Sequence, residues 1–383
     1  MIRYLTAGES HGKGLIVILD GIPAGLKINE EDINKELVRR QKGYGRGKRM
    51  ELESDKIEIL SGVRWSETIG SPICLFIKNK DYENNKSVMS IYQKDIDINK
   101  FILQPRPGHA DLSGILKFDR QDIRDISERA SARETSVRVA AGAICKKFLE
   151  KFNIKIYSFV EEICGIKITN SNFDVEKLYE KIETSLLRCP EEFTEKKWIE
   201  IIDKAKEKGD TVGGIFTIII KDVPPGLGSY TQWDLKLDAC LSKGIMSIQG
   251  VKGIEFGKGF EFAKKFGSEV HDEIFYNKKY YRKTNNCGGI EGGMSNGEDI
   301  VIRAVMKPIP SLQRPLRSVN IKTKKPQEAQ IVRADITAVS ACAVIGEAVS
   351  AIEIANSFKE KFGGDNMKEI NQRYLSYLKK ITE

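Results

Sequence analysis

Histidine is scarce in this chain, and its cysteines form no recognisable pattern. Only three histidines occur among 383 residues. The seven cysteines include no Cys-x-x-Cys pair and are odd in number, which argues against a disulfide framework and against a zinc site. We therefore predict no metal ion, and we expect a reducing, cytoplasmic compartment.

Long apolar runs are also missing. The first residues lead straight into a motif, without the basic and apolar regions of a secretory signal. No apolar run stands out as long enough to cross a bilayer. We expect neither secretion nor insertion into a membrane.

The chain does have enough apolar sequence for a substantial core. With 40% hydrophobic residues, it can form one large domain or two. Its net charge of +8 fits a nucleic-acid partner or an anionic small molecule, and composition alone does not separate them.

Apolar periodicity predicts the main elements. Strands are expected over Gly14 to Leu19, Ile57 to Val63, Pro72 to Ile77, Gly214 to Ile220 and Ile300 to Met306. Helices are expected from a cap at Asn29 to Arg40, and over Ala132 to Phe152, Thr194 to Lys208 and Ala338 to Phe358. The charged face of the helix at 194–208 is most simply a solvated surface.

One pattern occurs twice. The apolar strand at 14–19 leads to Ile-Pro-Ala-Gly-Leu, and the strand at 214–220 leads to Val-Pro-Pro-Gly-Leu. Duplication would make two related halves, about 1–205 and 206–383, within a single domain that spans 1–383. The alternative is coincidence, because apolar strands that end at Pro-Gly are common.

Two of the three histidines stand beside glycine. His11 lies in Gly-Glu-Ser-His-Gly and His109 in Arg-Pro-Gly-His-Ala-Asp. Histidine exchanges protons near neutral pH, and glycine lets the backbone approach a ligand closely. These motifs favour proton chemistry, although each histidine could instead cap a turn.

The segment 39–49, Arg-Arg-Gln-Lys-Gly-Tyr-Gly-Arg-Gly-Lys-Arg, is strongly basic. Cations with an interleaved tyrosine could bind nucleic acid. A glycine-rich loop with arginine forks could equally wrap a small anion, or be a solvated loop without a partner.

Other arginines favour a small anion. Arg106 is close to His109, Arg129 and Arg133 are one helical turn apart, and Arg333 precedes Asp335 by two residues. Arginines that converge from distant segments suit a substrate with several negative groups, and a helix start at Ser131 would add backbone N–H groups. Taken singly, Arg133 and Glu134 could be a surface ion pair.

The glycine-rich stretch 285–297 lacks the spacing of a Walker A loop or a dinucleotide-binding fingerprint, so neither an ATPase nor a Rossmann enzyme is indicated. Its backbone could approach a flat or phosphorylated ligand. A glycine-rich hairpin without a ligand is the competing interpretation.

The order of these motifs, together with Ser-Ala-Arg-Glu-Thr, Asn-Asn-Cys-Gly-Gly-Ile-Glu-Gly-Gly-Met-Ser-Asn-Gly and Arg-Ala-Asp, resembles the chorismate synthase family. The resemblance runs from Ala7 to the helix after Asp335. It implies an α+β fold in which helices lie between antiparallel sheets, a β-α-β sandwich rather than a Rossmann fold, in a homotetramer.

The resemblance also implies an activity. The family converts 5-enolpyruvylshikimate 3-phosphate to chorismate by a 1,4-anti elimination of phosphate in the shikimate pathway of aromatic amino acid biosynthesis. The reaction needs reduced FMN, supplied by an external flavin reductase or another NAD(P)H-linked source. Such an enzyme is a carbon–oxygen lyase acting on a phosphate.

The residue roles implied by the resemblance fall into three sets. The catalytic set is His11, His109 and Asp335. The substrate-binding set is Ser10, Arg40, Arg46, Arg49, Arg106, Arg133 and Arg333. The flavin-binding set is Arg129, Ala130, Ser131, Gln249, Gly250, Gly292, Lys307, Pro308, Ile309, Pro310, Ser311 and Arg333.

The chain departs from the family pattern at two places. Ala334 stands where the family often has serine, and Gln249-Gly250 replaces a pair that more usually ends in alanine. Two alternatives stay open: a bifunctional form that reduces flavin with NAD(P)H, and a basic nucleic-acid-binding protein.

Overall fold

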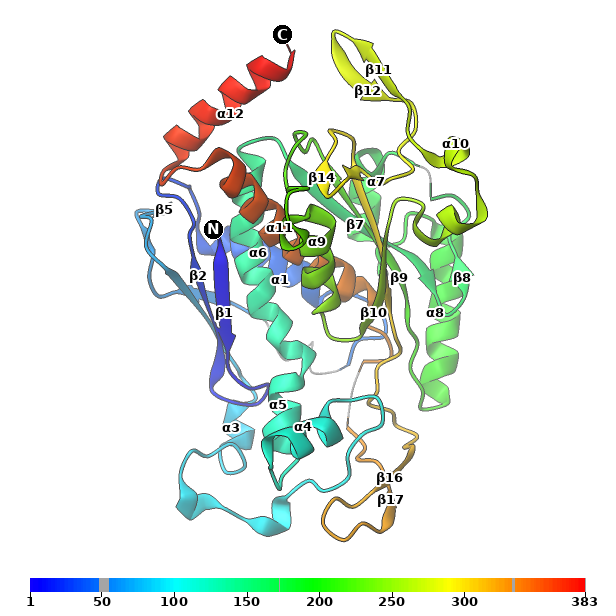
Figure 1. Ribbon diagram of the computed structural model, residues 1–383. Coiled ribbons are helices and arrows are strands. Elements are labelled where there is room, and N and C mark those ends of the chain that lie inside the picture. The colour runs from blue at the N-terminus through cyan, green and yellow to red at the C-terminus, as the bar shows by residue number, and fades with distance from the viewer. Residues whose placement is uncertain (48–54, 172, 333–334, 383) are drawn as a thin grey trace.

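In the computed structural model, which describes residues 1–47, 55–171, 173–332 and 335–382, two antiparallel sheets enclose a layer of helices. Figure 1 shows one sheet on the left, the other on the right, and α1, α6, α9 and α11 between them. The predicted α+β sandwich is confirmed.

The first sheet has the strand order β1-β2-β6-β3, and every neighbouring pair is antiparallel. Its strands are β1 (Arg3–Ala7), β2 (Gly14–Asp20), β6 (Ile73–Lys78) and β3 (Ile57–Ile59). In β6 the alternating side chains Ile73, Leu75 and Ile77 are fully buried, as expected for a sheet with one covered face. The predictions for 14–19 and 72–77 are confirmed.

The predicted strand at 57–63 is wrong in extent, because β3 ends at Ile59. Gly62 has a φ of +83°, and a side chain there would collide with Ile73. The chain turns at this glycine. Val63–Arg64 (β4) then pairs with Glu67–Thr68 (β5) in a separate hairpin.

The second sheet has the order β10-β15-β9-β7-β8 and is also antiparallel. Its strands are β10 (Val251–Phe256), β15 (Ile300–Met306), β9 (Gly214–Lys221), β7 (Lys155–Ile163) and β8 (Ile166–Lys167). The strands predicted at 214–220 and 300–306 are confirmed.

The helical layer consists mainly of α1 (Glu30–Gln41), α6 (Thr135–Glu150), α9 (Leu237–Met246) and α11 (Val339–Phe362). Asn29 caps α1 as predicted, accepting a 2.9 Å hydrogen bond from the backbone N–H of Asp32. Where α6 crosses α11, a Cβ on Gly142 would lie 2.5 Å from the Cβ of Ala348, so glycine permits the close approach.

Several helix ends differ from the prediction, and the largest difference is at α11, which continues past Phe358 to Phe362. The helix expected from Ala132 begins as a short 3₁₀ turn, Ala132–Glu134 (η3), and becomes α-helical at Thr135. The helix expected over 194–208 is α8 (Glu192–Glu207), on the outer side of the second sheet (Figure 1).

Contrary to the expectation from composition, one helix is long and apolar enough to cross a membrane. This is α11, and 89% of its apolar window is buried inside the protein. A helix that is apolar all round suits a position between two sheets, so α11 packs as a core helix.

The remaining elements are short or peripheral. They are α3 (Tyr82–Asn85), η1 (Gln93–Asp95), η2 (Ile98–Lys100), α4 (Asp111–Phe118), α5 (Arg124–Ala130), α7 (Val175–Thr184), η4 (Trp233–Leu235), η5 (Gly259–Lys264), α10 (Gly267–Val270), β11 (Ile274–Asn277), β12 (Lys279–Arg282), β13 (Ile290–Glu291), β14 (Met294–Ser295), β16 (Arg317–Val319), β17 (Pro326–Glu328) and α12 (Met367–Thr382).

The two segments of the predicted duplication have similar local structure. Each is a strand followed by a turn whose glycine has positive φ, +86° at Gly25 and +84° at Gly226. One hydrophobic core runs through both sheets and the helices between them. These similarities support two related halves in one domain, which stays a prediction.

Candidate functional site

His11 follows β1 and is anchored to a carboxylate that the sequence did not reveal. Its Nδ1 lies 2.9 Å from Oε1 of Glu128, on α5, and its backbone N–H donates to the same carboxylate at 2.7 Å. Asp81 lies 3.8 Å from its Nε2. With Nδ1–H directed to Glu128, Nε2 is the nitrogen set for proton exchange.

His109 repeats this arrangement with Asp111. Its Nδ1 lies 2.5 Å from Oδ1 of Asp111, whose side chain is fully buried. Arg106 donates to Asp111 through Nε at 2.8 Å and Nη2 at 3.0 Å. Burial alone would raise the pKa of Asp111, but hydrogen bonds from His109 and Arg106 hold that pKa well below its usual range. The histidine is thus paired with a stable anion.

Ser10 joins the His11 loop to the predicted flavin residues. Its hydroxyl is buried and accepts a 3.2 Å hydrogen bond from Ser131. Arg129, at the end of α5, donates to the backbone carbonyls of Thr6 and Gly8. The predicted helix start at Ser131 is the three-residue turn η3, capped by the Ser131 hydroxyl itself.

Arg129 and Arg133 do not share one helix, as their spacing had suggested. The chain breaks at Ser131 between α5 and η3. Arg129 is exposed, whereas Arg133 is 5% exposed. The idea of a surface pair between Arg133 and Glu134 is wrong, because both side chains are buried and Arg133 pairs with Asp55 instead, at 2.7 Å.

Arg40 and Arg133 share the buried carboxylate of Asp55. Arg40 donates to the hydroxyl of Thr135 and the carbonyl of Ala132, each at 3.0 Å, and its Nη1 lies 3.8 Å from Asp55. That Nη1 is buried and has no hydrogen-bond acceptor among the residues that the structure describes. Burial, opposed by Asp55 and reinforced by the neighbouring arginines, lowers the pKa of Arg40 to about 10.

Asn79 links this pair to the His11 loop. Its amide group donates to the carbonyls of Glu9 and Gly12, and its oxygen accepts from Arg133 Nη2 at 3.1 Å. A single buried side chain therefore fixes His11 relative to Arg133.

Arg46 pairs with Asp335 close to Arg40. Its Nε lies 2.9 Å from Asp335 Oδ2, and the backbone N–H of Gly47 donates to Oδ1 at 2.6 Å. Arg46 and Asp335 are among the charges that shift the pKa of Arg40. Arg40, Arg46 and Arg133, with Asp55 and Asp335, are called the arginine pocket below.

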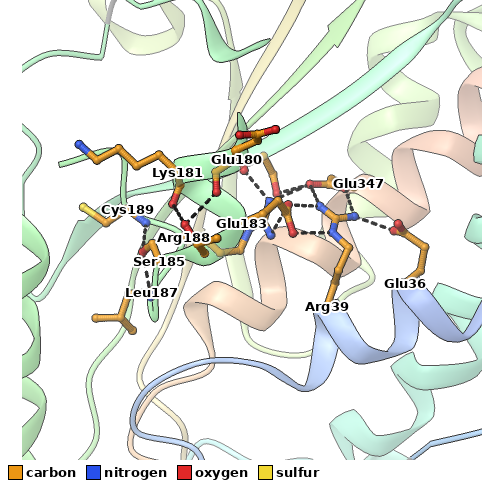
Figure 2. A network of polar contacts seen from close by, with 12 residues as sticks. Glu36, Arg39, Glu180, Lys181, Glu183, Ser185, Leu187, Arg188, Cys189 and Glu347 are labelled. Atoms are coloured by element: carbon orange, nitrogen blue, oxygen red, sulfur yellow. Dashed lines mark hydrogen bonds and ion pairs between the residues drawn. The ribbon is translucent and has the colours of Figure 1, made fainter. Parts of the chain in front are cut away.

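Arg39, the neighbour of Arg40, lies in a different environment (Figure 2). It donates to Glu36, Glu183 and Glu347, at distances between 2.6 and 2.9 Å. Arg188 pairs with Glu183 and Glu347, and Lys146 with Glu36 and Glu347. These six residues are called the Glu347 network below.

The described part of the basic segment is therefore not a solvated loop. Arg39 and Arg40 are enclosed, and Arg46 is paired with Asp335. Tyr44 donates its hydroxyl to Asp203 at 2.8 Å and packs against the core, which does not favour base stacking. Of the three interpretations, the contacts favour a small anion.

Gln249 and Gly250 connect the two histidine regions. Gln249 donates to Glu134 at 3.2 Å, and Glu134 accepts from Thr6, which in turn accepts from Arg129. The carbonyl of Gly250 accepts from the backbone N–H of Lys307, and Lys307 Nζ donates to the carbonyl of Gly108, beside His109.

The segment 307–311 continues that connection. Ile309 accepts from the hydroxyl of Thr211 at 2.8 Å, and Ser311 accepts from Arg106 Nη1 at 3.0 Å. The backbone of Val212 bonds to Ile336, which bonds to Gly45. Figure 1 shows α4 beside the chain that leads from β15 to β16. Contacts thus run continuously from His109 to the loop of Arg46.

One predicted residue that the structure describes, Gly292, is not joined to this set, and two others lie outside the described residues. Gly292 lies in the turn between β13 and β14, and Figure 1 draws β14 at the end of the molecule away from α4 and α5. Its φ is +58°, and a Cβ there would meet nothing within 4 Å. Arg49 and Arg333 lie outside the described residues, as does Ala334.

Sequence reasoning missed Glu128, Asp55, Asn79, Thr135 and the role of Glu134. Glu128 directly precedes Arg129, and Asp111 stands two residues after His109, so an acid beside each motif was the available signal. Asp55 and Asn79 carried no such signal, because they lie 78 and 54 residues from Arg133, the partner that they share.

Three comparisons with known proteins point to one family. The sequence model of the family described as "Chorismate synthase" matches residues 2–358. The chorismate synthase of Geobacter sulfurreducens is 52% identical over 390 aligned residues, which cover 100% of this chain and 99% of that protein. The chorismate synthase of Endomicrobium trichonymphae is 51% identical over 383, with the same coverage. A solved structure described as "Crystal Structure of Chorismate Synthase" has a TM-score of 0.80 and 43% identity, covering 100% of this chain and 98% of that one.

Proposed function

The chain belongs to the chorismate synthase family, and from this premise we propose that the arginine pocket and the two histidine pairs hold substrate beside a flavin. It is a lyase of the shikimate pathway that converts 5-enolpyruvylshikimate 3-phosphate to chorismate. The family implies a flavin cofactor, and we propose that its working form is reduced FMN.

Anion binding by the arginine pocket rests on one observation. Arg40 and Arg133 are buried there close to Arg46, and Arg40 keeps a buried donor without an acceptor among the described residues. The substrate carries a phosphate and two carboxylates, and arginine forks suit both groups. We assign Arg40, Arg46, Arg106 and Arg133, with Ser10, to the substrate. By resemblance, Arg49 and Arg333 belong to the same set.

The two histidines are proposed as proton donors. Each gives its Nδ1–H to a carboxylate, Glu128 for His11 and Asp111 for His109, so that Nε2 is the exchanging atom. One donates toward the departing phosphate and the other toward the flavin's ring edge. Glu128 and Asp111 hold the two imidazole rings in orientation.

Asp335 is proposed as the base that accepts the proton of flavin N5. The Gly47 N–H and Arg46 hold its carboxylate in one orientation.

Two features of Gln249 and Gly250 support the proposed flavin site. Gln249 has a buried oxygen with no donor among the described residues, and Gly250, at a φ of +86°, lets the backbone approach a flat ligand. Arg129, Ala130, Ser131, Gly292, the segment 307–311 and Arg333 complete the set by resemblance. These residues would hold reduced FMN, which would supply a transient electron for the loss of phosphate without net redox change.

Further proposals concern the surroundings of the enzyme. We propose a homotetramer that receives reduced flavin from an external reductase or another NAD(P)H-linked source. A cytoplasmic location is supported by the seven cysteines, all of which are free thiols.

The decisive experiment is anaerobic. Chemically reduced FMN and 5-enolpyruvylshikimate 3-phosphate are added to the purified protein, and chorismate absorbance is followed together with phosphate release. Equimolar chorismate and phosphate, formed only with reduced flavin, are expected. Product with oxidised FMN and NADPH would reveal a built-in reductase, and no product with a folded protein would contradict the proposal.

A further inference from the structure

Glu134 lies between two residues that are proposed to bind flavin. Its side chain is buried, at 9% exposure. One carboxylate oxygen accepts from the Thr6 hydroxyl at 3.0 Å, and the other accepts from Gln249 Nε2 at 3.2 Å. Thr6 in turn accepts from Arg129 Nη2 at 2.7 Å. Arg129, Thr6, Glu134 and Gln249 thus form one chain of hydrogen bonds.

This chain determines which way the amide of Gln249 faces. An ionised carboxylate only accepts hydrogen bonds, so the NH₂ end of the amide must face Glu134. The amide oxygen then faces the opposite way. This orientation follows from the chemistry of the pair, because reversing the amide would set two acceptors against each other.

The Gln249 amide oxygen that faces away from Glu134 has no hydrogen-bond donor among the described residues. Gln249 Oε1 is buried and accepts no hydrogen bond from any residue that the structure describes. A buried acceptor left without a donor is costly, so a ligand N–H is the group that this position suits.

We propose that Glu134, assisted by Thr6, is a positioning residue that holds the Gln249 oxygen toward the flavin as the acceptor for a ring N–H. This inference rests on the proposed flavin site. The oxidised isoalloxazine ring has a single N–H, at N3, which identifies the atom to test.

The test compares FMN with 3-deaza-FMN, which keeps nearly the same ring shape but has carbon in place of N3 and therefore lacks the N3–H donor. Binding of the oxidised forms is measured from the change in flavin absorbance or fluorescence. The wild-type protein should bind FMN about tenfold more tightly, the value of one hydrogen bond. In Glu134→Gln the neighbouring amide offers both a donor and an acceptor, so the Gln249 amide can reverse and the ratio should fall toward one.

A merely structural role would weaken both flavins equally and leave the ratio unchanged, which would overturn the proposal. Glu161→Gln is the matched control, because Glu161 is also buried and also accepts from a threonine, Thr217, but lies in the second sheet. It should keep the wild-type ratio.

A second variant covers the case in which Glu134→Gln does not fold. Thr6→Val removes the hydroxyl that holds one oxygen of Glu134 and should lower the ratio about two- to threefold. An unchanged ratio there contradicts the chain of hydrogen bonds. If the wild-type protein binds neither flavin, the proposed flavin site fails; if it binds both equally, that site stands and the role of Glu134 is wrong.

Discussion

Arg39 and Arg40 are adjacent at the end of α1, yet they lie in opposite electrostatic surroundings. Arg39 belongs to the Glu347 network, in which three cations meet three carboxylates: Arg39, Lys146 and Arg188 with Glu36, Glu183 and Glu347. Arg40 belongs to the arginine pocket, in which three described arginines meet two carboxylates.

The pKa values follow this difference. Burial alone would lower the pKa of Arg39, but the charges of Glu347 and Glu36 and hydrogen bonds to Glu183 and Glu347 raise it above its usual range. The pKa of Arg40 falls to about 10 because burial and neighbouring arginines outweigh Asp55. The Glu347 network holds the fold together, whereas a buried arginine whose acidic partner does not offset its burial suits an anionic ligand.

The largest expected effect on the free energy of unfolding comes from breaking the Glu347 network. Glu347→Gln leaves Arg39, Lys146 and Arg188 with less negative charge in a fully buried place. Removing one partner of a buried ion pair costs about 3–5 kcal/mol, so the free energy of unfolding should fall by that amount. Urea denaturation measures it. Glu192→Gln, at an exposed pair with Lys196, should cause no measurable change.

Removing a pocket acid should instead affect turnover. Asp335→Asn keeps the shape but removes the proposed base, so turnover should fall about 100- to 10,000-fold while flavin binding stays near wild type. Asp20→Asn, at the surface pair with Arg3, is the control. Full activity in Asp335→Asn would remove Asp335 from its role.

Removing the under-paired arginine should separate stability from affinity. Arg40→Met loses charged hydrogen bonds to the substrate, worth about 1.5–3 kcal/mol, so substrate affinity should fall about 10- to 150-fold. The unfolding free energy should change far less than in Glu347→Gln, because the pocket loses surplus charge. Steady-state kinetics measure the substrate affinity and urea unfolding measures the stability, with Arg3→Met as the control. A loss of unfolding free energy as large as in Glu347→Gln would contradict the comparison.

At acid pH, the difference in unfolding free energy between wild type and Glu347→Gln should become smaller. The charges of Arg39, Lys146 and Arg188 overcome burial and hold the pKa of Glu347 well below its usual range. The stability that it contributes is therefore present above the unfolded pKa, about 4.3, and is lost as pH falls toward the folded value. Below pH about 4, the gap between wild type and variant should shrink by about 1.4 kcal/mol per pH unit.

The difference between wild type and Arg40→Met should stay constant over that acid range. The pKa of Arg40 is about 10, so the guanidinium does not titrate there. Unfolding curves from pH 6 to pH 3, recorded for both variants, compare the two regions directly. If the difference from wild type becomes smaller to the same extent in both variants, the acid effect does not arise from Glu347.

Local sequence was sufficient for the elements that periodicity and capping control. The alternation in 214–220 and 300–306 predicted strands with nearly correct ends, and Asn29 predicted the start of α1. The motifs around His11 and His109 also pointed to the site, because glycine and a scarce histidine occur together there. Such signals act within a few residues, where backbone preference and hydrogen bonding to the nearest neighbours decide the structure.

Only the tertiary structure decided which charges are partners. The sequence could not distinguish Arg39 from Arg40, because Glu347 and Asp55 reach them only through the packing of α11 and the first sheet against α1. For the same reason it could not pair His11 with Glu128, 117 residues away. Electrostatic energy depends on distance and burial in the folded layers, and these are set when the two sheets close on the helices between them.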